Sequence, residues 1–197
     1  LVGVAVDDTR LPKTGHCIAQ AQYHRDPMSP PFHTNLMWSL RFLQASVLLP
    51  LHRSGPFSCR ALPIRFEEVS TVKKPGRRAD EQTWETYREE KKKRNLSQRF
   101  VQSMAQLRSG FDEAGADQKV IVIAGDGSFC NRTVFAGIPN RVELIARTRK
   151  DSKLCLRAPA DSRCFYSKGK FTPEQVRLDD SIFWKTTKIF YGGKRRK

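Results

Sequence analysis

The stretch VIVIAGDGSF, residues 120–129, decides how this chain folds. Four β-branched residues in succession are typical of a short strand that is covered on both faces. The strand is expected to end near Gly125, where Asp126 follows. A carboxylate at the tip of a buried strand is unfavourable unless it is paired or binds a metal ion. Asp126 is therefore expected to have a cationic partner, either a basic side chain or a metal ion.

The same pattern occurs near the beginning of the chain, in VAVDDTRLPKTG, residues 4–15. An apolar run predicts a strand over 2–6, and Asp7 and Asp8 follow it. Open α/β sheets present their ligand-binding groups at the carboxyl ends of strands. If the two strands are neighbours, their carboxylates repel one another, and a divalent cation removes that repulsion. Oxygen ligands of this kind suit Mg²⁺ or Mn²⁺.

Two other interpretations of Asp126 stay open at this point. Asp-Gly-Ser is an ordinary turn sequence, in which the aspartate accepts a hydrogen bond from its own backbone. The spacing of Gly125 and Gly127 also invites a dinucleotide-binding interpretation, but Cys130 stands where the third glycine is needed. Asp126 would in addition place a negative charge inside the phosphate-binding turn. The dinucleotide interpretation is therefore disfavoured.

The remaining strands are less sharply defined. We expect 2–6 and 17–23 to form a hairpin. The apolar segment 36–49 fits a helix or a buried strand, and its periodicity does not choose between them. Residues 59–69 predict an edge strand, because Pro63 cannot donate to a central ladder.

A helix and a second strand–helix–strand unit complete the expected fold. Asp80 is a suitable N-cap for a long central helix with one apolar face. A short helix over 131–138 and a strand over 141–147 follow the run at 120–129. Together these elements predict an α/β fold with a mixed sheet, whose core spans about 1–150. Residues 151–197 are expected to form a basic, loosely structured extension with one late strand at 181–191. The apolar helix face consists of Leu96, Phe100, Met104, Leu107 and Phe111.

The net charge and the composition of the chain indicate which kinds of molecule it binds and which classes of protein are excluded. The chain has 36 Lys and Arg against 20 Asp and Glu, a formal charge of +16, which favours a polyanion such as nucleic acid. The longest apolar stretch, 42–51, is too short to span a membrane, and we expect a cytoplasmic protein without a membrane partner. Five cysteines without a C-x-x-C pair argue against a disulfide framework and a cysteine zinc site.

The two acidic stretches carry a resemblance. VDDTRLPKTG and DGSFCNRTVF, the latter continued by RVELIARTRKDSKLC, resemble the first two acidic motifs of bacterial insertion-sequence DDE transposases. The resemblance implies a ribonuclease-H-like catalytic domain that uses Mg²⁺ or Mn²⁺ to hydrolyse DNA at transposon ends and join it to target DNA. It implies Asp8 and Asp126 as catalytic ligands. Asp7, the neighbour of Asp8, is the alternative first ligand and a further candidate metal ligand.

The resemblance also has a limit and further implications. The family has a third acid, a glutamate well downstream of the second aspartate, and nothing after Arg147 matches that motif. We therefore expect a fragment, with a sheet incomplete at its C-terminal side, and leave open whether it is an active enzyme. A homodimer is expected for the full-length protein. Contacts with DNA phosphates are expected from Lys13, Arg147, Arg149 and Lys150.

Two alternative functions follow from the same residues. The chain could be a non-catalytic, basic nucleic-acid-binding remnant, since two of three acids do not suffice for full catalysis. It could also be another ribonuclease-H-like nuclease, such as a resolvase. Metal-dependent DNA nicking separates the first alternative from a transposase, and strand joining separates the second.

Overall fold

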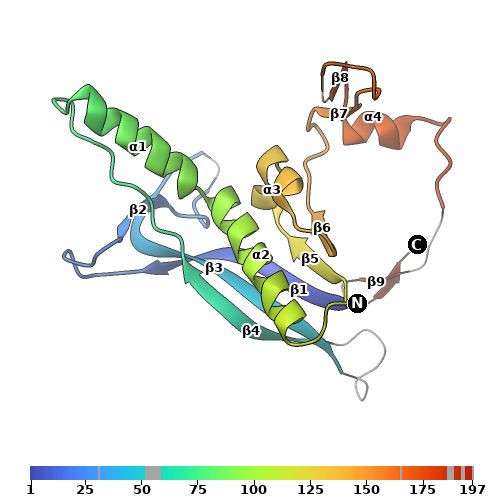
Figure 1. Ribbon diagram of the computed structural model, residues 1–197, viewed down its shortest axis with the longest axis horizontal. Coiled ribbons are helices and arrows are strands. Elements are labelled where there is room, and N and C mark those ends of the chain that lie inside the picture. Colours follow the sequence, from blue (N-terminus) through green and yellow to red (C-terminus); the bar gives the residue numbers. More distant parts are fainter. Residues whose placement is uncertain (31, 52–58, 165, 186–188, 192–193, 197) are drawn as a thin grey trace. The chain divides into compact units, whose positions relative to one another are not determined.

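A computed structural model describes the chain except for residues 31, 52–58, 165, 186–188, 192–193 and 197 (Figure 1). The chain divides into two compact units, Leu1–Ala146 and Arg147–Lys197. None of the helices in the described ranges is both long enough and apolar enough to cross a membrane.

The first unit contains a six-stranded mixed sheet. Its main path runs β2-β3-β1-β5-β6, and β4 also pairs with β3. The strand β3 is antiparallel to β1, β2 and β4, whereas β5 is parallel to both β1 and β6. The expected mixed α/β sheet is confirmed. The strands are β1 (Val2–Pro12), β2 (Gln22–Arg25), β3 (Leu36–Pro50), β4 (Cys59–Glu68), β5 (Ile121–Gly125) and β6 (Val142–Ala146).

The strand β3 organises the sheet and corrects the expected hairpin. The segment 36–49, which fitted a helix or a strand equally well, is a strand. It pairs with β1 along one edge, so β1 and the 17–23 segment do not form a hairpin. The short β2 pairs with β3 instead. A long apolar strand offers more paired backbone and buried surface than a short polar one, which explains the preference.

The edge position of β4 is confirmed. Its register against β3 shifts between Ala45 and Ser46, where Arg65 and Pro63 are the successive partners. One residue, Ile64, is therefore extra on β4. A bulge at a sheet edge accommodates proline, because the ladder is already interrupted there.

Two helices stand where one long helix was expected, so that expectation is wrong. The helix α1 (Glu81–Lys93) begins at Asp80, whose carboxylate accepts a hydrogen bond from the Thr83 N–H at 2.7 Å, as predicted. The helix α2 (Leu96–Glu113) begins anew at Asn95, whose side chain accepts from the Gln98 N–H at 2.9 Å. A side-chain cap of this kind competes with helix continuation, because it satisfies the first free N–H groups of a new helix.

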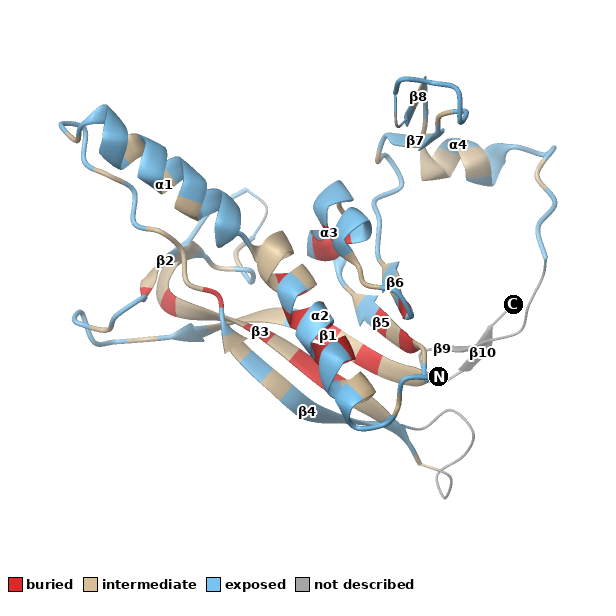
Figure 2. Ribbon diagram, viewed as in Figure 1, coloured by how far each residue is buried: buried red, intermediate tan, exposed pale blue. Residues whose placement is uncertain are grey.

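The core lies between α2 and one face of the sheet (Figure 2). Phe100 and Met104 of α2 are fully buried against strand residues such as Val4 and Ile123. On the other face of β5, Ala124 is exposed, so the expected coverage of this strand on both faces is wrong. The 3₁₀ turn η2 (Gly127–Phe129) and α3 (Arg132–Gly137) follow β5 and add buried side chains to the same core.

The second unit holds short elements. The strands β7 (Leu154–Arg157) and β8 (Tyr166–Phe171) pair antiparallel, and α4 (Pro173–Leu178) begins with a capping box at Thr172. The late strand expected over 181–191 is shorter: residues 181–185 are not a strand, and 186–188 lie outside the described residues. Strand structure is present in β9 (Ile189–Tyr191), which pairs with β10 (Lys194–Arg196).

Candidate metal centre

The parallel pairing of β1 with β5 brings the two acidic stretches together. The last pair in this ladder is Val6 with Gly125. Beyond it, Asp126 leaves the sheet, whereas Asp7 and Asp8 continue in β1, which stays paired with β3 as far as Pro12. Asp7 and Asp8 therefore lie within β1 and not at its end, contrary to expectation. They stand where the partner strand β5 stops.

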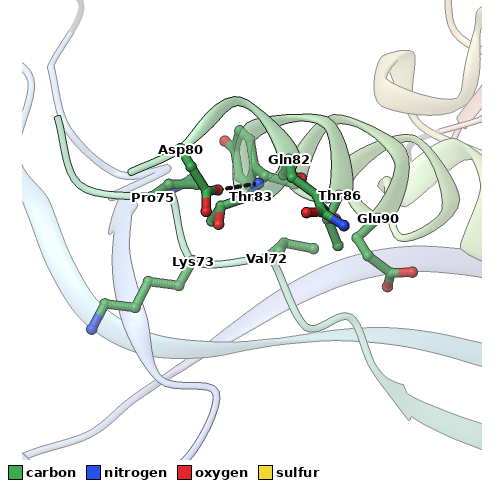
Figure 3. A pocket seen from close by; sticks show the side chains of 9 residues that line it. Val72, Lys73, Pro75, Asp80, Gln82, Thr83, Thr86 and Glu90 are labelled. Atoms are coloured by element: carbon green, nitrogen blue, oxygen red, sulfur yellow. Dashed lines mark hydrogen bonds between the residues drawn. The ribbon is translucent and has the colours of Figure 1, made fainter. Parts of the chain in front are cut away.

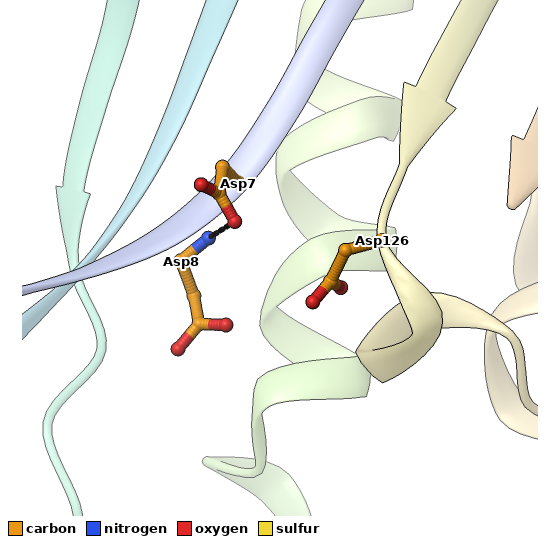
Figure 4. A group of neighbouring side chains, drawn as sticks. All are labelled: Asp7, Asp8 and Asp126. Carbon is orange, nitrogen blue, oxygen red and sulfur yellow. Dashed lines mark hydrogen bonds between the residues drawn. The ribbon is translucent and has the colours of Figure 1, made fainter. Parts of the chain in front are cut away.

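The three carboxylates form one cluster on the first unit (Figure 4). One oxygen each from Asp7, Asp8 and Asp126 lies within 4.8 Å of the other two. Asp7 and Asp126 are exposed, and the side chain of Asp8 is only 8% exposed. It is the one group of three potential metal-ligating side chains in the portion of the chain that the structure describes.

Asp8 is fixed by two arginines. The Arg41 guanidinium donates to Asp8 Oδ2 from Nε at 2.8 Å and contacts the same oxygen from Nη2 at 2.7 Å. Arg10 Nη2 lies 3.6 Å from that oxygen. In the sheet, Arg10 and Arg41 are direct cross-strand partners, two residues beyond Asp8. Their positive charge compensates the burial of the carboxylate and restricts its orientation.

Asp7 has an unfavourable environment for a charge. Partial burial raises the pKa of its carboxyl group, and the nearby charges of Asp126 and Asp8 raise the pKa further. The hydrogen bond from the Asp8 N–H to Asp7 Oδ1, at 2.9 Å, lowers the pKa in opposition. The net shift is upward. Repulsion among these carboxylates is the conflict that a bound cation relieves.

Asp126 also serves as a local cap. Its Oδ1 accepts from the Ser128 N–H at 2.9 Å, and its Oδ2 lies 3.2 Å from the Ser128 hydroxyl. The turn interpretation of Asp-Gly-Ser is thus correct. It is compatible with a metal role, because a carboxylate oxygen has a second lone pair after it accepts one hydrogen bond.

The donor set fits a small, hard cation. Mg²⁺ prefers octahedral oxygen ligands, and two opposite ligands lie about 4.2 Å apart, twice the usual bond length. The three oxygens lie within 4.8 Å of one another, which is only slightly more than this separation. The same oxygens could instead be shared between two ions separated by about 3.5–4 Å. Mn²⁺ accepts the same oxygen ligands.

The expected phosphate contacts are divided between the two units. Lys13 is half-buried directly after β1, and its backbone N–H donates to the Trp38 carbonyl at 2.9 Å. The second unit begins with the exposed Arg147, Arg149 and Lys150. Of these, Arg149 already makes two hydrogen bonds to Asp151, at 3.0 and 2.8 Å.

Arg41 was not among the site residues that the sequence predicted. A signal was present, since Arg41 is the single charged residue of the apolar segment 36–49. A lone charge in a buried strand requires a partner of opposite sign. The identity of that partner depends on strand pairing, which the sequence left open.

Similarity to known proteins adds no constraint on this site. The sequence motifs and the geometry of the three carboxylates are what bear on function. No family model, no curated protein and no solved structure matches this chain.

Proposed function

We propose that this chain is the catalytic portion of a DDE transposase with a ribonuclease-H-like sheet. It would act on DNA by metal-dependent phosphodiester hydrolysis followed by strand transfer. One observation carries the proposal: Asp8 and Asp126, separated by 126 − 8 = 118 positions, lie with Asp7 in one cluster of carboxylates. The mixed sheet and the motif resemblance support it, as does the net charge of +16.

In this proposal each aspartate has a distinct role. Asp8 and Asp126 are the principal ligands of Mg²⁺ or Mn²⁺, and Asp7 supplies the third carboxylate. The contacts of Arg41 and Arg10 all go to Asp8 Oδ2, so a cation would be bound through Oδ1. Ser128 holds the Asp126 carboxylate just beyond β5, through its N–H to Oδ1 and its hydroxyl to Oδ2.

A bound divalent ion supplies activation of water and stabilisation of the leaving oxygen in an in-line displacement. In the hydrolytic step, a water oxygen forms a bond to phosphorus, the bond to the 3′ oxygen breaks, and that oxygen takes a proton. In strand transfer, the freed 3′-hydroxyl attacks a phosphorus of target DNA and displaces its 3′ oxygen. The aspartates orient the attacking group, which is where enzymes gain much of their rate.

The test is nicking of supercoiled plasmid DNA by the whole chain. We expect nicking with Mg²⁺ or Mn²⁺ that is lost on chelation. Asp8→Asn and Asp126→Asn should each lower the rate at least about a hundredfold, because charge compensation at the reacting phosphate supplies several kcal/mol. Asp117→Asn is the matched control, since Asp117 is an exposed acid outside the cluster.

The outcomes separate the three functions. Nicking that persists in the Asp8→Asn, Asp126→Asn double variant would refute the assignment of these ligands. DNA binding without nicking in either metal would establish the non-catalytic alternative. Nicking without joining of a free 3′-hydroxyl end to target DNA would favour another ribonuclease-H-like nuclease.

A further inference from the structure

A groove of about 410 Å³ lies beside the cluster of three aspartates on the first unit, with Arg41 in its lining. One wall is the segment after β4, including Val69 and Thr71, and the other is the junction of α1 and α2 around Asn95. The Thr71 hydroxyl oxygen is buried without a hydrogen-bond partner among the described residues. The groove therefore offers space for a ligand between these two walls.

The lining of this groove carries only positive charge. Its charged residues are four cations and no carboxylate, namely Arg41, Lys74, Lys91 and Arg94. Arg94 is paired with Glu90 at 2.8 Å, but the two lysines have no carboxylate within 4.0 Å in the described ranges. Their ammonium groups lie over aromatic rings, Lys74 at 5.8 Å from Trp84 and Lys91 at 5.6 Å from Tyr87. Two cations are therefore available to a negatively charged ligand.

Arg41 connects this groove to the metal centre. The same guanidinium that binds Asp8 Oδ2 belongs to a residue that lines the groove. A ligand with several negative charges could therefore extend from the three aspartates into the groove. Such a ligand needs regularly repeated anionic groups along an extended chain.

A neighbouring groove between the 72–75 segment and α1 shows the contrast (Figure 3). It is of similar size, about 420 Å³, but its charged lining residues are Lys73, Asp80 and Glu90. The Asp80 carboxylate there is engaged in capping α1. The mixed charge of this second groove gives it no preference for an anionic ligand. Of these two grooves, only the one that adjoins the aspartate cluster has a wholly positive charged lining.

We propose that the groove between the 69–74 segment and the α1–α2 junction binds the phosphodiester backbone of the DNA strand that continues from the reacting phosphate. This rests on the proposed function, and it specifies where the substrate lies. Lys74 and Lys91 contact successive phosphates, and Arg41 positions Asp8 at the point where the strand passes the metal centre. These residues were not among the expected DNA contacts.

The test measures binding of a short fluorescent DNA duplex to the whole chain in EDTA, so that no cleavage contributes. Lys74→Gln, Lys91→Gln is compared with Lys92→Gln, Lys119→Gln, which removes the same charge at exposed positions outside the groove. We expect the groove variant to bind about tenfold more weakly and to lower the slope of log K against log salt by about 2. The control variant should differ from the unmodified chain less than twofold in affinity. Circular dichroism confirms that both variants fold.

An equal loss of DNA affinity in the two variants would refute the proposed role of the groove, because binding would then reflect net charge alone. Unchanged binding in the groove variant would overturn it as well. These results are independent of the proposed catalysis: the groove can fail while metal-dependent nicking is retained. Conversely, if the groove variant alone loses affinity while nicking is absent, the groove stands as a DNA site and the catalytic proposal fails.

Discussion

At the scale of single residues, Asp7 holds its negative charge in an unfavourable environment. Its folded-state pKa lies above the ordinary value of 3.8, with burial as the largest cause. The folded protein therefore binds the Asp7 proton more tightly than the unfolded chain. By linkage, this carboxyl group lowers the free energy of unfolding as pH rises from 3.8 through the raised pKa.

We predict that Asp7→Asn stabilises the metal-free protein above that range of pH. The gain should be at most about 1 kcal/mol, because the side chain is largely exposed and solvent screens its charge. It should vanish below pH 3.8, where the carboxyl group is neutral in both states. Urea unfolding in EDTA across a pH series measures the difference between variant and unmodified chain.

A second group with a shifted pKa, His24, affects both proteins equally, so its effect on stability cancels in this comparison. Burial, followed by the charges of Arg41 and Arg10, lowers the pKa of His24, so its own effect on stability falls below pH 6.5. It is present in both proteins. Asp117→Asn should show no comparable pH-dependent gain. A variant less stable than the unmodified chain at neutral pH in EDTA would contradict repulsion at Asp7.

At the scale of elements, the two helices have different roles. In α2, Phe100 is fully buried and its ring stacks on Phe129 with centroids 4.4 Å apart. In α1 no residue is buried, and Trp84 is only half-buried. The stability of the first unit should therefore depend on α2, while α1 contributes mainly the wall of the groove.

We predict that Phe100→Ala lowers the free energy of unfolding by about 3–5 kcal/mol, the usual effect of removing a buried aromatic ring. Trp84→Ala on α1 is the comparison, with an expected loss below about 1 kcal/mol. Denaturant unfolding gives both values. A similar loss in the two variants would show that α1 packs as tightly as α2, contrary to the burial pattern.

At the scale of the whole molecule, the buried apolar cluster belongs to one unit. Its fully buried members all lie between Val4 and Val142, within Leu1–Ala146. The three aspartates and the basic groove lie within the same range. The first unit thus contains the described core and both candidate sites.

We predict that residues 1–146 fold on their own and unfold cooperatively. The reason is that an intact core, rather than chain length, supplies most of the free energy of folding. Far-ultraviolet circular dichroism with thermal melting tests this, and Phe100→Ala in the shortened chain provides the destabilised reference. A shortened chain that binds hydrophobic dyes and melts without a cooperative transition would show that the second unit is required.

The sequence by itself determined the features that depend on near neighbours. The apolar run before Asp126, the cap at Asp80 and the apolar face at Phe100 and Met104 are local patterns, and all are present in the structure. The three candidate ligands were identifiable in the same way, because each acidic side chain follows an apolar run. The cap at Asn95 is local too, and it begins a second helix where the apolar spacing predicted one long helix.

Only the tertiary structure decided which strands pair. The periodicity of 36–49 carried no information about its partners, because a predominantly apolar segment can be buried as a helix or a strand. Once β3 lies between β1 and β4, Arg41 meets Asp8, and the groove forms beside them. These contacts join residues far apart in the chain, and their free energy arises from burial and charge pairing that no local pattern specifies.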